Sequence, residues 1–134
     1  MITSNEINAQ RLLEQAGFEI QEVKEHLQRI DVFFFSVVYN YKNLSIHCII
    51  GTQENMNYGS VTNRAWLKTT MYEAHKIETI LKIPIFSRSN RGMKWDINNL
   101  KTKIKQIVEK IVEHNAFIEF IKQNDESRFW IELA

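Results

Sequence analysis

Hydrophobic and polar positions recur along this chain with two periods, and each period predicts one kind of element. Residues 32–39 are β-branched or aromatic almost throughout, which is typical of a central strand. Residues 44–50 carry an apolar side chain at every second position, so they predict a second strand that pairs with the first as a hairpin over 32–50. The same alternation over 128–133 predicts a C-terminal strand.

Apolar positions spaced by three and four residues predict helices near 5–16, 62–82 and 97–123. Ser4 is the predicted N-cap of the first helix, and Gly17 is the residue expected to end it. The third helix has a seam with coiled-coil spacing. This seam either packs across the domain's own sheet or forms a homodimer through helix 97–123.

The segments between these elements are shorter or more polar. The polar tract 51–60 predicts a loop, and residues 83–97 predict a second hairpin around a polar turn. Residues 18–23 indicate a short strand, although 22–30 fits a helix equally well. Together the pattern predicts one α+β domain over residues 1–134, with a mostly antiparallel sheet packed by the three helices.

Composition narrows the class of protein. The chain has 134 residues, of which 44% are hydrophobic and 25% charged, and this is the profile of a single globular domain. No apolar run reaches the ~18 residues of a transmembrane helix, so no membrane partner is expected. Cys48 is the single cysteine, and the first residues lack the basic and apolar regions of a signal peptide. A cytoplasmic location is therefore expected.

The net charge of +1 hides a strong asymmetry along the chain. Residues 1–31 sum to −3, 32–60 to 0, 61–105 to +7 and 106–134 to −3. The +7 segment contains ten basic and three acidic side chains, with aromatic residues among the cations. Such a segment predicts a surface that binds a polyanion, since lysine and arginine neutralise phosphates and aromatic rings stack on bases.

A helix over 62–82 would place several of these cations on one stripe. The candidate binding residues are Arg64, Lys68, His75 and Lys82 on that helix, Arg88, Arg91, Lys94 and Trp95 in the following hairpin, and Lys101 and Lys105 at the start of the long helix. The helix dipole disfavours cations near an N-terminus, so the last two favour a purpose other than folding. The competing interpretation is a solvated face that the acidic terminal segments neutralise.

The sequence thus predicts a small non-catalytic binding domain whose basic face, residues 64–105, engages an anionic partner. That partner is either nucleic acid or an acidic protein. An inhibitor or immunity-type protein that blocks a target by protein interaction would show the same features, and it is the first alternative.

A metal-dependent nuclease is a further alternative. The predicted order through residue 87 is helix, three strands, helix, strand, which is compatible with the core of the restriction-endonuclease-like fold. That chemistry needs carboxylates on neighbouring strands to hold Mg²⁺. Asp31 precedes the predicted central strand, but residues 45–50 contain no acid, so the motif is incomplete.

Other catalytic chemistry finds little support. No two of the four histidines have HxH or HxxxH spacing, so no metal site is predicted. No phosphate-binding glycine pattern occurs, so no cofactor is predicted. His47 and Cys48 are consecutive in a strand and point to opposite faces. Glu78, at the edge of the apolar arc of helix 62–82 and beside His75, is the best single acid/base candidate.

Overall fold

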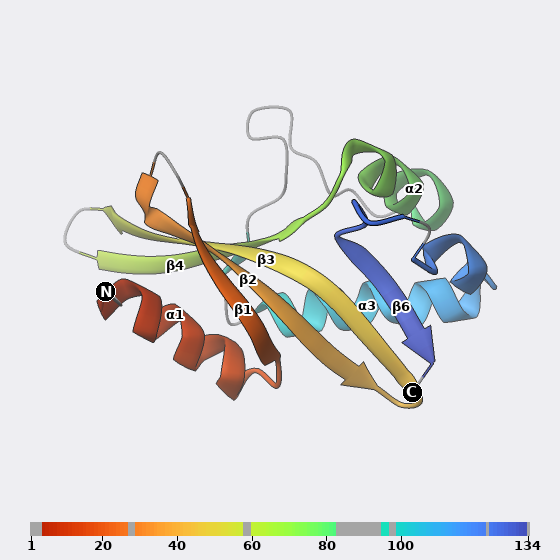
Figure 1. Ribbon diagram of the computed structural model, residues 1–134, viewed down its shortest axis with the longest axis horizontal. Helices are drawn as coiled ribbons and strands as arrows, with labels where there is room; N and C mark the ends of the chain where they lie inside the picture. The colour runs from red at the N-terminus through yellow and green to blue at the C-terminus, as the bar shows by residue number, and fades with distance from the viewer. Residues whose placement is uncertain are drawn as a thin grey trace.

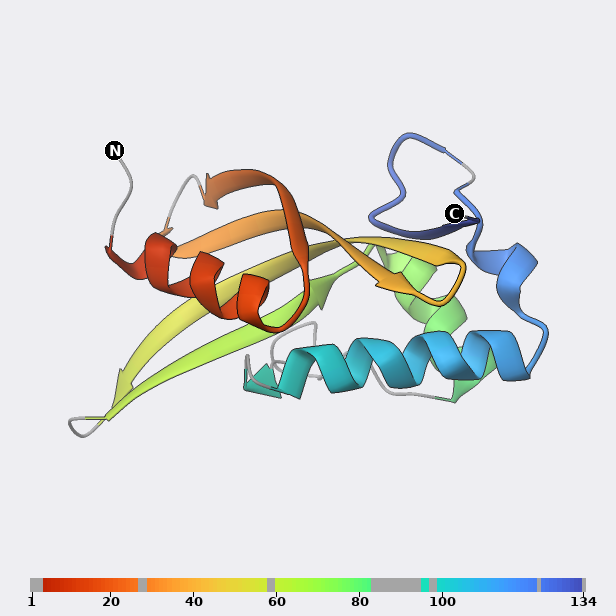
Figure 2. The same cartoon turned by 90° about the horizontal axis from the view of Figure 1, so that it is seen from below.

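A twisted antiparallel sheet forms the body of the protein, with helices packed against one of its faces (Figures 1 and 2). The computed structural model describes residues 4–26, 29–57, 60–82, 95–96, 99–122 and 124–133. The elements are α1 (Ser4–Gln15), β1 (Glu19–His26), β2 (Arg29–Tyr41), β3 (Leu44–Asn57), β4 (Ser60–Lys68), α2 (Met71–Leu81), β5 (Trp95–Asp96), α3 (Leu100–Glu113), the 3₁₀ helix η2 (Phe117–Phe120) and β6 (Phe129–Leu133). The predicted class, a single α+β domain, is confirmed.

Strand β3 pairs with three other strands. The sheet order is β1-β2-β3-β4-β5, and β6 also pairs with β3. One edge of β3 pairs with β2, from Tyr41 opposite Leu44 to Val32 opposite Gln53. The opposite edge is divided, because β6 pairs with residues 44–48 and β4 pairs with residues 49–57. As a result, β4 and β6 lie end to end along the same edge.

Alternate residues along the strands are apolar, and they form the face of the sheet that packs against α3. On β3 this inner face carries Ile46, Cys48 and Ile50, which are almost fully buried. They join one core cluster with side chains from α1, α2 and α3, among them Leu13 and Ile107. Figure 2 shows α3 running along this side of the sheet. Burial of these aliphatic and aromatic groups is the main stabilising contribution to a fold of this size.

Helix α1 ends as the sequence predicts. Gly17 has φ 97°, a left-handed conformation that glycine adopts without steric cost. The N–H of Phe18 donates to the carbonyl of Leu13 at 3.1 Å, and the N–H of Gly17 donates to Glu14 at 3.0 Å. These two bonds form a Schellman motif, which turns the chain into β1. Residues 22–26, which also fitted a helix, belong to this strand.

The predicted helix over 62–82 is wrong in its first half. Residues 60–68 form β4 because their alternation fits a strand: Ala65 and Leu67 are buried in the core, and Trp66 and Lys68 are half-buried on the other face. The predicted loop 51–60 is also wrong, since β3 continues to Asn57. The polar tract extends a long hairpin in which β3 and β4 satisfy each other's backbone groups.

The predicted helix 97–123 is shorter than expected. α3 ends at Glu113, because Asn115 takes a left-handed conformation with φ 53°. The N–H of Ala116 then donates to Ile111 at 2.9 Å, closing a second Schellman motif. His114 is exposed at this end and does not lie on a seam. Of the hairpin predicted over 83–97, β5 pairs with β4, whereas residues 83–94 lie outside the described residues.

No helix within the described ranges is long and apolar enough to cross a membrane.

A buried carboxylate ties α2 to β6. Thr70 caps α2 and accepts from the N–H of Glu73, while the Glu73 carboxylate accepts from the N–H of Thr70 at 2.9 Å. The other oxygen of Glu73 accepts from the N–H groups of Arg128 at 2.9 Å and Phe129 at 3.3 Å. One side chain therefore completes a capping box and also fixes the start of a strand 55 residues away.

Replacing this carboxylate tests its role in the fold. Glu73→Ala leaves three buried or part-buried N–H donors without their acceptor, so we expect a loss of about 2–4 kcal/mol in the free energy of unfolding, measured by urea denaturation. Glu113→Ala, an exposed acid at the end of α3, is the matched control and should change stability by less than about 0.5 kcal/mol. Equal effects of the two variants would contradict the assigned role.

Candidate functional site

The face of the sheet opposite α3, here called the outer face, carries the polar and aromatic residues of the central strands. Its residues follow from the register: Phe34, Gly51 and Trp66 lie in one row, Ser36, Ile49 and Lys68 in the next, and Val38, His47 and Trp130 in the third. β4 supplies the outer end of the first two rows and β6 the outer end of the third. The division of β3 between these two strands therefore places both tryptophans on one face.

Trp66 lies flat on β3. A Cβ atom built on Gly51 would fall on Cε2, Cζ2 and Nε1 of the Trp66 indole, so a side chain at position 51 and this ring exclude each other. The Cβ position lies nearest to Cε2, the fusion atom that is recessed between Cζ2 and Nε1 on that edge. An atom approaching in the ring plane would be nearer to the two outer atoms, so the Cβ position faces the ring. One indole face thus rests on the backbone at Gly51, and the opposite face points away from the sheet.

Phe34 and Lys68 complete this part of the face. The Phe34 ring is perpendicular to Trp66, at 89° with centroids 6.3 Å apart. The ammonium of Lys68 lies 4.0 Å from the centroid of Phe34, a cation–π contact. All three side chains are half-buried. The result is a flat indole beside an upright phenyl ring, with a cation over that phenyl ring. We call Phe34, Trp66 and Lys68 the aromatic–lysine cluster.

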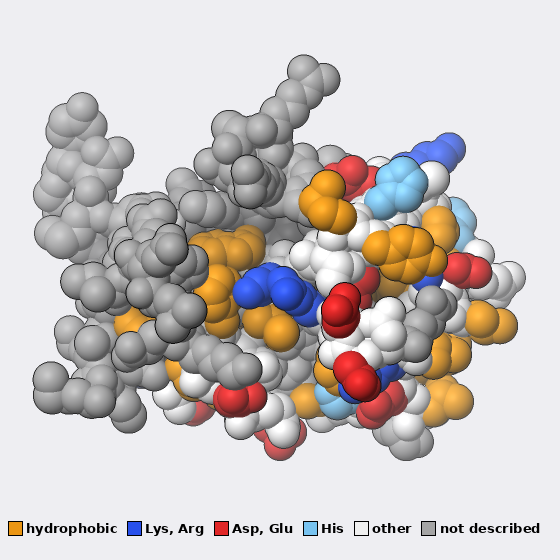
Figure 3. Space-filling view, turned by 45° about the horizontal axis from the view of Figure 1, so that its top comes forward, with side chains coloured by type: hydrophobic (Ala, Val, Ile, Leu, Met, Phe, Trp, Pro, Cys, Tyr) orange, Lys and Arg blue, Asp and Glu red, His pale blue; other side chains and the backbone are white. Residues whose placement is uncertain are grey.

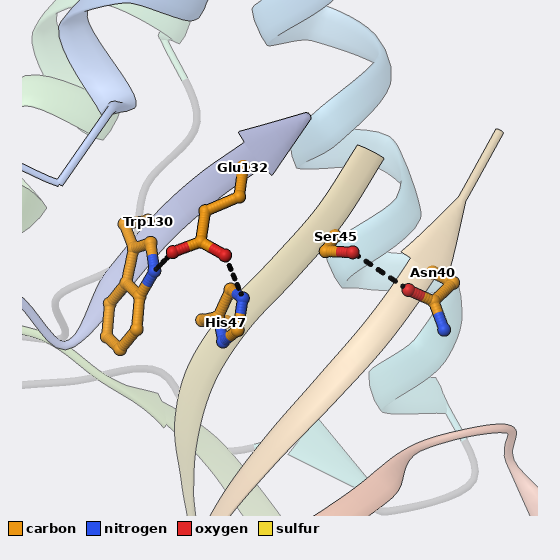
Figure 4. A network of polar contacts seen from close by, with 5 residues as sticks. All are labelled: Asn40, Ser45, His47, Trp130 and Glu132. Carbon is orange, nitrogen blue, oxygen red and sulfur yellow. Dashed lines mark hydrogen bonds and ion pairs between the residues drawn. The ribbon is translucent and has the colours of Figure 1, made fainter. Parts of the chain in front are cut away.

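A second aromatic pair lies further along the outer face (Figure 4). The rings of His47 and Trp130 stack with centroids 4.7 Å apart and an angle of 4°. Glu132 joins them: one carboxylate oxygen lies 3.0 Å from His47 Nε2, and the other accepts from Trp130 Nε1 at 3.1 Å. The ammonium of Lys122 lies 4.6 Å from the Trp130 centroid. Glu132 therefore holds a second aromatic surface in place, again with a lysine above it.

The predicted basic stripe does not exist as a stripe, because it assumed one helix over 62–82. Lys68 is on β4, whereas His75 and Lys82 are exposed on α2 and at its C-cap. Lys105 is exposed on α3, with its ammonium 3.9 Å from Glu109. In Figure 3 one central group of Lys and Arg side chains lies between hydrophobic side chains, and carboxylates are scattered around it. The described cations in this view do not form a continuous basic surface.

Several predicted site residues can be placed only in part. Arg64 lies in β4 opposite Gln53, Trp95 lies in β5 opposite Ala65, and Lys101 is in α3, but their side chains lie outside the described part. Arg88, Arg91 and Lys94 lie wholly outside it.

The catalytic candidates are not brought together in a recognisable site. Asp31 is in β2, but its side chain lies outside the described part. Four strands, not three, separate α1 from α2, so the order that suggested the nuclease core is not the one observed. Glu78 is half-buried on α2, and His75 is exposed. Within the described ranges, no three His, Cys, Asp or Glu side chains could hold a metal ion.

Cys48 is a core residue. Its thiol faces the inner side of β3 and is 2% exposed, and burial raises its pKa to about 12. The thiol therefore stays protonated near neutral pH, and the reactive thiolate form is not populated. His47, its neighbour in sequence, faces the opposite side of the sheet, as the alternation of a strand requires.

A groove of about 210 Å³ lies between α2, η2 and the turn before β6. Its cation is Lys76, whose ammonium donates to the carbonyl of Glu119 at 2.8 Å and lies 3.6 Å from that residue's carboxylate. Lys76 also lies over the Tyr72 ring at 4.6 Å. Glu73 at the groove wall is occupied by backbone donors. These contacts link α2 to η2 and β6, so the groove contributes mainly to the fold.

The aromatic–lysine cluster was not recognised as a unit from the sequence, although each of its parts has a signal. The sequence pattern predicts a loop over 51–60 and a helix over 62–82, which places Gly51 and Trp66 in different kinds of element. A glycine inside a strand often marks the close approach of another group, and Trp66 with Lys68 at a spacing of two is the pattern of one strand face. Comparison with known protein families, curated proteins and solved structures finds no match to this chain.

The packing of Trp66 on Gly51 makes a quantitative prediction. Gly51→Ala should destabilise the protein by about 1–3 kcal/mol, because the new methyl group displaces the indole. In a Trp66→Ala background the same substitution should be neutral or slightly stabilising, since alanine is favoured over glycine in a strand. Urea denaturation of the four proteins in this cycle gives the coupling energy. Additive effects would contradict the flat packing of the ring.

Proposed function

We propose that this protein is a small binding domain that engages an anionic partner through the outer face of its sheet, at the aromatic–lysine cluster. The observation that carries the proposal is the indole of Trp66, laid flat on Gly51 with Lys68 beside it. An aromatic surface with an adjacent cation provides the two contacts that nucleic acids use, stacking and charge neutralisation, and an acidic protein would use the second. The +7 segment 61–105, which includes β4, supports this choice of face.

Charged residues of both signs lie along the outer face. β1, at the far edge of the sheet, carries Glu19 and Glu22 opposite Val38 and Ser36, and Lys24 opposite Phe34. The described lysines of this face, Lys68 and Lys122, lie over rings on the β4 and β6 side. We therefore expect an anionic chain to bind along β4 and β6, where these two lysines lie over aromatic rings and the Glu132 carboxylate is engaged by His47 and Trp130.

Charge reversal at Lys68 tests the proposed face. Lys68→Glu should shorten retention on heparin and reduce the slope of log Kd against log salt by about 1, because one contact between a cation and an anionic group is lost. Lys110→Glu, the same charge change at an exposed position of α3, is the matched control and should retain the wild-type behaviour. If both variants behave alike, the binding surface is not the outer face.

The double variant Arg88→Glu, Arg91→Glu distinguishes anion binding by the outer face from anion binding by the basic segment that precedes β5. If it abolishes heparin binding while Lys68→Glu has no effect, the basic segment binds anions without the aromatic–lysine cluster, and the proposed surface is wrong. If no anionic polymer is retained by the wild-type protein even at low salt, the proposed function is wrong.

A further inference from the structure

The last row of the inner face stays partly open where α3 ends. Tyr41, Leu44 and Leu133 lie opposite one another in this row, because β6 ends beside the β2–β3 turn (Figure 1). Tyr41 and Leu44 are half-buried, whereas Leu133 is 73% exposed. Val112, in the last turn of α3, is 49% exposed. Large apolar side chains that remain exposed next to one another mark an interaction surface.

A groove of about 330 Å³, here called the end groove, lies between this row and α3. The β2–β3 turn, with Lys42, forms one wall, and α3, with Glu109 and Glu113, forms the other. Of the apolar residues named above, all but Leu133 line the groove. A cavity of about 150 Å³ already holds a benzene molecule, so the end groove has room for an aliphatic side chain.

We infer that the end groove is the interface through which two copies of this chain form a symmetric dimer. In a two-fold dimer the same patch of both copies meets, so the patch must be complementary to itself. The apolar part fulfils this condition, because it combines a groove with a protruding leucine beside it. Leu133 of each copy is then covered by the apolar surface of the other copy.

The charges of the end groove fulfil the same condition. Lys42 is exposed on one wall and Glu113 on the other, whereas Glu109 already accepts from the Tyr41 hydroxyl at 3.2 Å. A two-fold axis along the groove places the turn of each copy against α3 of the other, so Lys42 and Glu113 of different copies face each other. A partner with charges of one sign would meet a like charge on one wall, which is unfavourable. The charges therefore favour a second copy.

This dimer does not use the coiled-coil seam of α3. The seam residues Leu100, Ile104, Ile107 and Ile111 are buried in the core, so the seam packs across the domain's own sheet. Only the last turn of α3 contributes to the end groove. The dimer also leaves the outer face of the sheet accessible, so this inference is independent of the proposed anion binding.

Sedimentation equilibrium of the wild-type protein provides the first test. We expect the average mass to rise from that of the monomer toward twice that value between about 10 μM and about 1 mM, since a small interface associates weakly. A monomer mass over the whole range would overturn the inference. A mass that continues to rise beyond the dimer would also overturn it, because a two-fold interface is closed.

Substitution of Leu133 tests the apolar contact. Leu133→Asp buries a carboxylate in the interface and should raise the Kd of the dimer by roughly 10-fold or more. Met71→Asp is the matched control, because Met71 is 74% exposed on α2, which contacts the start of β6 and not its end. It should leave the Kd unchanged. Urea midpoints confirm that both variants are folded, and equal effects of the two would overturn the inference.

Exchange of the two charges tests the symmetry. Lys42→Glu and Glu113→Lys each create two like-charge contacts in the dimer, so each should raise its Kd by roughly 10-fold. The double variant restores opposite charges at both contacts and should recover most of the loss. If the double variant dimerises as weakly as the single variants, or if neither single variant has an effect, the end groove is not the interface.

Discussion

The sharing of β3 between three strands is the constraint on which the rest of the structure depends. Its edge with β2 is continuous, but its other edge changes partner between Cys48 and Ile49, from β6 to β4. This change brings Trp130, near the end of the chain, onto the same face as Trp66. Backbone pairing of residues far apart in sequence thus assembles an aromatic surface that no single segment contains.

The two faces of β3 have different packing roles. On each face the packing depends on the size of the side chains at alternate positions of the strand. Ile46, Cys48 and Ile50 fill the core against α3, where close packing tolerates few changes in volume. On the outer face His47 stacks with one tryptophan, and the missing side chain of Gly51 makes room for the other. A glycine here weakens the strand intrinsically, and the contact with the indole compensates for part of that cost.

Much of the fold could be predicted from periodicity, and the errors have physical causes. The central hairpin, α1 with its Gly17 end and the C-terminal strand were strongly patterned and were confirmed. Residues 62–70 fit both periods, and pairing with the polar second half of β3, which no local pattern shows, selects the strand. The coiled-coil seam continued past residue 113, but Asn115 ends α3 through a conformation that spacing cannot reveal. The basic stripe was predicted for a single helix over 62–82, and it is wrong because residues 60–68 form a strand. Lys68, one of its residues, is nevertheless a member of the candidate surface.

The most direct test of the proposed binding face is to map the bound surface by ¹H–¹⁵N correlation spectra of the labelled protein titrated with a heparin oligosaccharide. Binding at the outer face should shift the indole N–H of Trp66 and the backbone amides of Phe34, Ile49 and Lys68 most, with those of Trp130 and Lys122 also affected. Shifts confined to the exposed faces of α1 and α3, with the signals of Trp66 and Lys68 unchanged at saturation, would contradict it.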